Sequence, residues 1–169
     1  MPSPTLSEFF PHELIRAGQD KLVQDLDKAF TEKKILLAHA PTGLGKTASA
    51  LSVAVYHALQ QKKKVFFLTN RHTQHQIAVN TLKLMKEKTG KEISCADLIG
   101  KRWMCSHDVA NLFGNEFNEF CKKVVEKGEC EFYNRVRTKD KLKVEAKALV
   151  GNLIRQGPLH NEEVMAISK

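Results

Sequence analysis

The sequence lacks the long apolar runs of a membrane protein and the basic, apolar leader of an exported one. Its longest apolar runs lie near Ile35–Ala38 and Val65–Leu68, far short of the roughly 20 residues that a membrane-spanning helix needs. The first ten residues carry neither a basic start nor a long apolar stretch, so we expect no signal peptide and no membrane partner.

The sequence also contains no Cys-x-x-Cys pair, although it has four cysteines between Cys95 and Cys130. A zinc ribbon or knuckle is therefore a poor match. In a reducing compartment, clustered cysteines more often bind a metal or a cluster than form disulfides. Two alternatives stay open from the residues alone: some of these thiols are buried apolar side chains, or all four cysteines hold a zinc ion.

The composition is that of a folded, soluble domain with a basic surface. The 169 residues are 42% hydrophobic and 27% charged, with a net charge of +8, which excludes a disordered or collagen-like chain. An excess of positive charge is compatible with a polyanionic partner, but it is weak evidence because most lysine-rich surfaces are only solvated.

The hydrophobic periodicity predicts an α/β fold in the first part of the chain. Apolar runs predict buried strands at Ile35–Ala38, Val65–Leu68 and Ile93–Leu98, and periods of three and four predict helices over 11–33, 46–61 and 73–88. Strands that alternate with helices are typical of a parallel sheet with right-handed crossovers. After about residue 99 the strand pattern ends, and we expect helices near 109–127 and 141–155. We therefore expect one domain over 1–99 and another over 100–169.

The strongest chemical signal is a glycine-rich loop that follows a predicted strand and begins a predicted helix. It is formed by Ala40, Pro41, Thr42, Gly43, Leu44, Gly45, Lys46 and Thr47. In such a loop the glycines let backbone N–H groups approach phosphate oxygens, the lysine contacts the β- and γ-phosphates and the threonine hydroxyl binds Mg²⁺. The sequence therefore predicts binding of ATP and Mg²⁺, with Lys46 and Thr47 as catalytic residues.

Two further features concern the nucleotide. Arg16 and Gln19 lie three residues apart before the loop, and a glutamine amide can pair with the adenine edge because it offers one donor and one acceptor. Hydrolysis also needs an acidic residue that holds Mg²⁺, but the sequence contains no Asp-Glu pair. We expect this chain alone to bind ATP weakly and to hydrolyse it poorly, as a fragment of something larger.

Together these motifs resemble the XPD family of iron–sulfur superfamily 2 DNA helicases, the archaeal members most of all. The resemblance rests on the Arg16–Gln19 helix, the loop and three cysteine segments, Lys-Arg-Trp-Met-Cys105, Phe-Cys121 and Glu-Cys130-Glu-Phe-Tyr133. It implies a RecA-like motor domain 1, present in part, followed by an incomplete iron–sulfur domain. It also implies ATP-dependent 5′ to 3′ DNA unwinding of the nucleotide-excision-repair type, in a monomer that is cytoplasmic, or nuclear in a eukaryote.

The resemblance assigns roles residue by residue. Cys105, Cys121 and Cys130 match the first three ligands of a four-iron, four-sulfur cluster, and the fourth cysteine is expected beyond Lys169, whereas Cys95 matches no ligand. The candidate contacts to single-stranded or forked DNA are Arg71, Thr73, Lys101 and Arg102. The basic stretch from Arg135 to Arg155 is a further candidate to follow single-stranded DNA.

Two other function classes stay open. One is a stand-alone P-loop kinase or nucleotide-binding switch, in which the cysteine spacing is incidental. The other is a nucleic-acid-binding module in which Cys95, Cys105, Cys121 and Cys130 bind zinc. DNA-stimulated ATP hydrolysis separates the helicase from the kinase, and elemental analysis separates iron from zinc.

Overall fold

The computed structural model describes residues 5–109, 111–138 and 141–168. The chain divides into two compact units, Met1–Ile93 and Ser94–Lys169. The first unit contains the 3₁₀ helix η1 (Leu6–Phe9) and the helices α1 (Gln19–Thr31), α2 (Lys46–Gln61) and α3 (His72–Thr89). The second unit contains α4 (Gly114–Glu126), α5 (Glu131–Val136), the strands β1 (Arg137–Thr138) and β2 (Lys141–Leu142), α6 (Val144–Gln156) and α7 (Asn161–Ile167).

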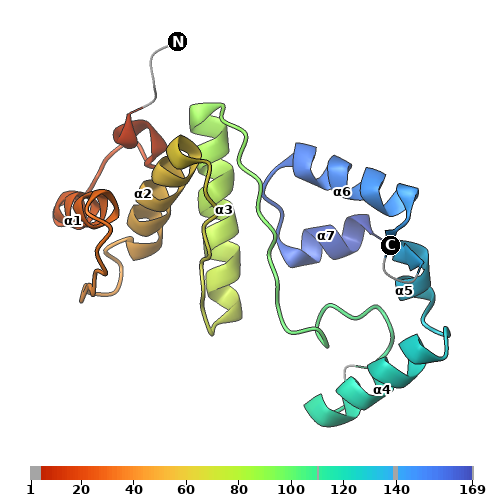
Figure 1. Ribbon diagram of the computed structural model, residues 1–169. Coiled ribbons are helices and arrows are strands. Elements are labelled where there is room, and N and C mark those ends of the chain that lie inside the picture. The colour runs from red at the N-terminus through yellow and green to blue at the C-terminus, as the bar shows by residue number, and fades with distance from the viewer. Residues whose placement is uncertain (1–4, 110, 139–140, 169) are drawn as a thin grey trace. The chain divides into compact units, whose positions relative to one another are not determined.

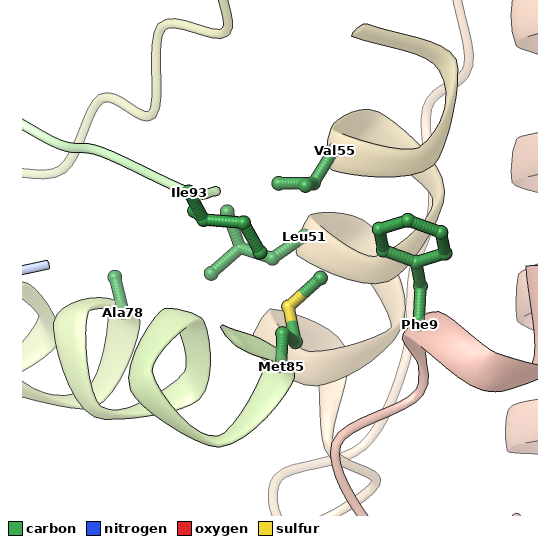
Figure 2. Packing of buried hydrophobic residues seen from close by; sticks show 6 residues of the cluster. All are labelled: Phe9, Leu51, Val55, Ala78, Met85 and Ile93. Carbon is green, nitrogen blue, oxygen red and sulfur yellow. The ribbon is translucent and has the colours of Figure 1, made fainter. Parts of the chain in front are cut away.

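In the first unit, α2 lies between α1 and α3 (Figure 1). One apolar cluster joins η1, α2 and α3, and Figure 2 shows its buried residues, which are Phe9, Leu51, Val55, Ala78, Met85 and Ile93. A second cluster joins the first residues of the unit to α1 and α2, and its buried residues are Phe10, Val23, Ala48 and Val53. Helix α2 is therefore covered on two sides, and its start, where the glycine-rich loop ends, has a fixed position.

The helix predictions for the first unit are confirmed, with one boundary wrong. Helix α2 has the predicted bounds, and α3 begins and ends within a residue of 73–88. The first helix, predicted over 11–33, begins only at Gln19, because Gly18 precedes it with a left-handed backbone (φ 84°). A residue in that conformation ends a helical path, so the preceding residues belong to a loop.

The predicted parallel sheet is absent from the described residues, where the only sheet is the β1–β2 pair. The segments Ile35–Ala38, Val65–Leu68 and Ile93–Leu98 form no helix and belong to no sheet. A helix satisfies its backbone hydrogen bonds within one segment, whereas a strand needs a neighbour. Each helix therefore satisfies its own backbone hydrogen bonds, while the strand-like segments keep unpaired edges.

Two of these segments keep the alternating exposure that is typical of strands. Ile35 and Leu37 are both 94% exposed, and Phe66 and Leu68 are 83% and 88% exposed. The side chains between them, Leu36 and Phe67, are less than half as exposed. Since successive side chains of an extended chain point to opposite faces, each segment has one partly covered face and one bare apolar face.

The second unit is mostly helical, as predicted, but its helices are shorter than expected. Helix α4 begins at Gly114 rather than near Val109, because the Glu116 carboxylate accepts the backbone N–H of Phe113 and caps the helix there (2.9 Å). Helix α6 extends to Gln156. The antiparallel β1–β2 pair, α5 and α7 were not predicted. Over the described residues, no helix is long and apolar enough to cross a membrane.

Candidate nucleotide loop and cysteine module

The glycine-rich loop leads directly into α2, as the sequence predicts. Gly43 and Gly45 both have φ of +85°, a backbone region that only glycine enters at little cost. The Gly43 Cα faces open space, since a Cβ there would meet no atom within 4 Å. The start of a sixteen-residue helix provides backbone N–H groups without intrahelical partners, and these groups suit an anion.

The Lys46 ammonium at the end of the loop is hydrogen-bonded to the first two residues of the loop. Its Nζ donates hydrogen bonds to the backbone oxygens of Ala40 (2.8 Å) and Pro41 (2.9 Å), at the far end of the loop. Lys46 is exposed, and Thr47 beside it is half-buried. The ammonium is thus exposed to solvent and bonded only to neutral carbonyl oxygens. A charged phosphate oxygen is a stronger acceptor for it than a carbonyl oxygen. These residues fit the triphosphate of ATP.

Gln19 contacts the loop, and this contact was not foreseen from the sequence. Its side chain is only 3% exposed, and its Oε1 accepts a hydrogen bond from the backbone N–H of Arg16 (2.7 Å). A Cβ on Gly45 would lie 2.1 Å from the Gln19 Nε2, so the amide lies directly against the loop backbone. The structure therefore brings Gln19 to the phosphate loop and leaves the neighbouring Arg16 exposed.

The predicted DNA contacts of the first unit lie at the start of α3. Arg71 precedes the helix, and its backbone N–H donates to the Thr69 Oγ1 (3.2 Å). Arg71 and Thr73 are both exposed. Their side chains are available to a ligand, and their role in binding DNA stays a prediction.

The three predicted cluster ligands are not gathered into a closed metal site. Cys105 and Cys121 are half-buried and Cys130 is buried, and all are free thiols. Among the described residues, no group of three or more His, Cys, Asp or Glu side chains could hold a metal ion. The cysteines as they lie in this structure do not fit a four-iron, four-sulfur cluster.

The cysteine segments instead meet at His107. The His107 Nε2 lies 3.5 Å from the Cys130 Sγ. Its ring packs edge-on against Phe132, with ring centroids 4.8 Å apart, and against Phe120, 5.8 Å away. Phe120 adjoins Cys121, and His107 is two residues after Cys105, so residues from all three cysteine-bearing segments meet at one imidazole, although no three metal-binding side chains of the described residues lie together.

The remaining predicted residues lie in the turn before Cys105. Lys101 is exposed, whereas Arg102 is half-buried and donates from Nη1 to the Leu112 carbonyl (2.6 Å). Cys95 is apart from this turn, and its Sγ contacts the Leu159 carbonyl (3.9 Å).

Comparison with known proteins identifies related sequences. Residues 13–143 match the family described as "Type III restriction enzyme, res subunit". The chain is 34% identical over 64 residues to the probable ATP-dependent helicase MJ0942 of Methanocaldococcus jannaschii, which covers 38% of this chain and 10% of that protein. It is 27% identical over 117 residues to the 3′-5′ exonuclease DinG of Bacillus subtilis, covering 68% of this chain and 13% of that protein. No solved structure matches the chain significantly.

Proposed function

Since this chain belongs to the family of the type III restriction enzyme res subunit, we propose that it is the nucleotide-binding part of an ATP-dependent DNA helicase. The family implies a RecA-like motor domain of superfamily 2. The observation that carries the proposal is the loop geometry, in which the Lys46 ammonium lies on the Ala40 and Pro41 carbonyls at the start of α2. The chain spans about a tenth of the relatives' lengths, so unwinding belongs to a longer protein.

In the proposed site, each residue has a distinct role toward ATP. Lys46 exchanges its two carbonyl acceptors for phosphate oxygens and neutralises their charge, and the backbone N–H groups at the start of α2 add hydrogen bonds. The Thr47 hydroxyl binds Mg²⁺. Gln19 lies beside Gly45, and in this proposal its amide pairs with the adenine, with Arg16 nearby, after its Oε1 gives up the backbone N–H of Arg16. Bound ATP supplies the free energy of phosphoryl transfer. Hydrolysis also requires an acidic residue that holds Mg²⁺, and none of the residues proposed for this site is acidic.

The kinase alternative lacks support from the related proteins. Both relatives are named for activities on nucleic acids or as helicases, and the Pro-Thr-Gly at the start of the loop also favours a helicase over a kinase. ATP hydrolysis that depends on DNA distinguishes them, because a kinase transfers phosphate to its small substrate without DNA.

We expect the longer protein to hydrolyse ATP faster when single-stranded DNA is present, and to bind that DNA with steep salt dependence. Each Lys or Arg contact with a phosphate releases bound counterions, so affinity falls as salt rises. With several contacts, raising the salt from about 50 to 300 mM should weaken binding at least about 100-fold. ATP hydrolysis with and without oligonucleotide, and anisotropy of a labelled oligonucleotide, measure both effects. Equal affinity at the two salt concentrations contradicts the proposal.

The finer proposal is an iron–sulfur helicase of the XPD type, with 5′ to 3′ polarity and a role in DNA repair. The spacing of Cys105, Cys121 and Cys130 and the residues around them support it. The structure does not support a preformed site, since no three of these donors converge among the described residues. The cluster therefore stands on the sequence resemblance alone and is settled by metal analysis.

We expect iron and acid-labile sulfide, rather than zinc, in the longer protein purified without oxygen. Replacement of Cys105, Cys121 or Cys130 by serine should remove the iron, because the thiolate is the ligand. Cys95→Ser is the matched control and should leave the iron content unchanged. Zinc without iron, or loss of metal in Cys95→Ser, would instead favour the four-cysteine zinc module.

A further inference from the structure

The turn before Cys105 presents the only tryptophan of the sequence to solvent. Trp103 is 52% exposed, and the Arg102 guanidinium carbon lies 4.4 Å from the centroid of its ring. A guanidinium at this distance from an indole is a cation–π pair. The pair combines a flat apolar surface with a fixed positive charge.

Local contacts hold this pair in place. The Arg102 Nη1 donates a hydrogen bond to the Leu112 carbonyl (2.6 Å), and the Trp103 backbone N–H donates to the Gly100 carbonyl (2.8 Å). The indole also packs against Gly100, where a Cβ would lie 3.2 Å from the ring carbon Cδ1. Because both side chains are fixed before any ligand arrives, little conformational entropy is lost when one binds.

A second exposed ring adjoins the contact that holds Arg102. Phe113 is 77% exposed and directly follows Leu112, whose carbonyl holds Arg102. Its backbone N–H is fixed by the Glu116 carboxylate (2.9 Å), so that acid is engaged in capping its own helix. Lys101 adds an exposed ammonium next to Arg102. We call Lys101, Arg102, Trp103 and Phe113 the aromatic turn.

We propose that the aromatic turn is a platform on which bases of single-stranded nucleic acid stack. Every base has a flat π face that stacks on an aromatic ring, while Lys and Arg attract the backbone phosphates. A protein partner of the same apolar character is less well matched, since two of the four side chains are cations and the chain carries a net charge of +8. The inference rests on the nucleic-acid function proposed above and assigns it a surface in the second unit.

The single tryptophan makes the test direct, because its fluorescence reports on this site alone. We expect thymidine oligonucleotides of about 12 nucleotides, within the usual range of site sizes, to quench Trp103 fluorescence through stacking. Heparin, a polyanion without bases, should bind the basic surface without quenching. Equal quenching by heparin overturns base stacking and leaves charge attraction alone.

Variants then test each component by anisotropy of a labelled oligonucleotide. Trp103→Ala should weaken binding at least about five-fold, as expected for loss of one stacked base, and Trp103→Phe should restore most of it. Arg102→Lys keeps the charge but not the planar guanidinium, so it should weaken binding while preserving the salt dependence. Lys127→Ala, which removes an exposed charge without a ring, is the control and should change affinity less than Trp103→Ala.

The failures of the two proposals can be told apart. If the oligonucleotide binds, but neither quenches Trp103 nor loses affinity in Trp103→Ala, the platform is wrong and the helicase proposal stands. If the wild-type chain does not bind nucleic acid, and DNA does not stimulate ATP hydrolysis by the longer protein, then the platform and the helicase proposal are both wrong. Quenching together with loss of affinity in Trp103→Ala and rescue by Trp103→Phe supports the platform.

Discussion

Replacement of Lys46 by alanine is expected to weaken ATP binding about 10- to 100-fold, as loss of a charged hydrogen-bonding group implies. The lysine provides the only side-chain cation inside the loop sequence from Ala40 to Thr47. Its removal leaves the phosphates with backbone N–H groups alone. The affinity is measured for the chain with a fluorescent ATP analogue in the presence of Mg²⁺, and the hydrolysis rate of the longer protein should fall by a similar or larger factor.

The matched control is Lys64→Ala. Lys64 is also exposed and lies three residues after the last residue of α2. The variant therefore removes an equal charge at the end of the helix that is opposite to the loop. Unfolding by urea should show that both variants keep nearly wild-type stability, because Lys46 is exposed and its two bonds are to the loop itself. Unchanged ATP affinity in Lys46→Ala contradicts the assignment of the loop.

Replacement of Phe9 by alanine is expected to destabilise the chain by about 3–5 kcal/mol, the usual cost of deleting a buried phenyl ring. Phe9 is 1% exposed and packs edge-on against Tyr56, with ring centroids 5.7 Å apart. Its removal opens a cavity between η1, α2 and α3 (Figure 2). Since whole domains are stable by about 5–15 kcal/mol, the loss is a large part of the total. Urea unfolding followed by circular dichroism measures it.

Phe66→Ala provides the contrasting variant within the same unit. Its ring is largely exposed, so its loss should change the stability of this chain by less than about 0.5 kcal/mol. A large loss in Phe66→Ala shows that Val65–Leu68 packs into the core rather than lying at the surface. Equal effects of the two variants contradict the division into a packed helical core and bare extended segments.

The sequence predicted those parts of the fold that depend on local contacts. The bounds of α2 follow from the loop before it and the periodic apolar residues within it, and both signals are local. The strand-like segments were recognised from their apolar character, but a sheet also needs partner strands, which no local pattern guarantees. Gly18, which lies within the range 11–33 predicted as helix, is an ordinary helix-breaking signal, and α1 begins only after it.

The same distinction explains the candidate sites. The loop from Ala40 to Thr47 could be identified because its chemistry lies in consecutive residues. The contact of Gln19 with Gly45 joins residues on separate elements, and no sequence spacing encodes it. The position of His107 beside Cys130 and two phenyl rings likewise depends on how the second unit folds, and no local pattern encodes it.

The bare apolar faces of Ile35–Ala38 and Val65–Leu68 also govern how this chain behaves in solution. Unpaired extended backbone with exposed Ile, Leu and Phe side chains is a template for pairing between copies, and hence for aggregation. The net charge of +8 opposes this association through repulsion between copies. Dissolved salt screens that repulsion over a distance of about 10 Å at 0.1 M. We therefore expect the solubility of the isolated chain to be greatest at low ionic strength, where its like charges keep the copies apart.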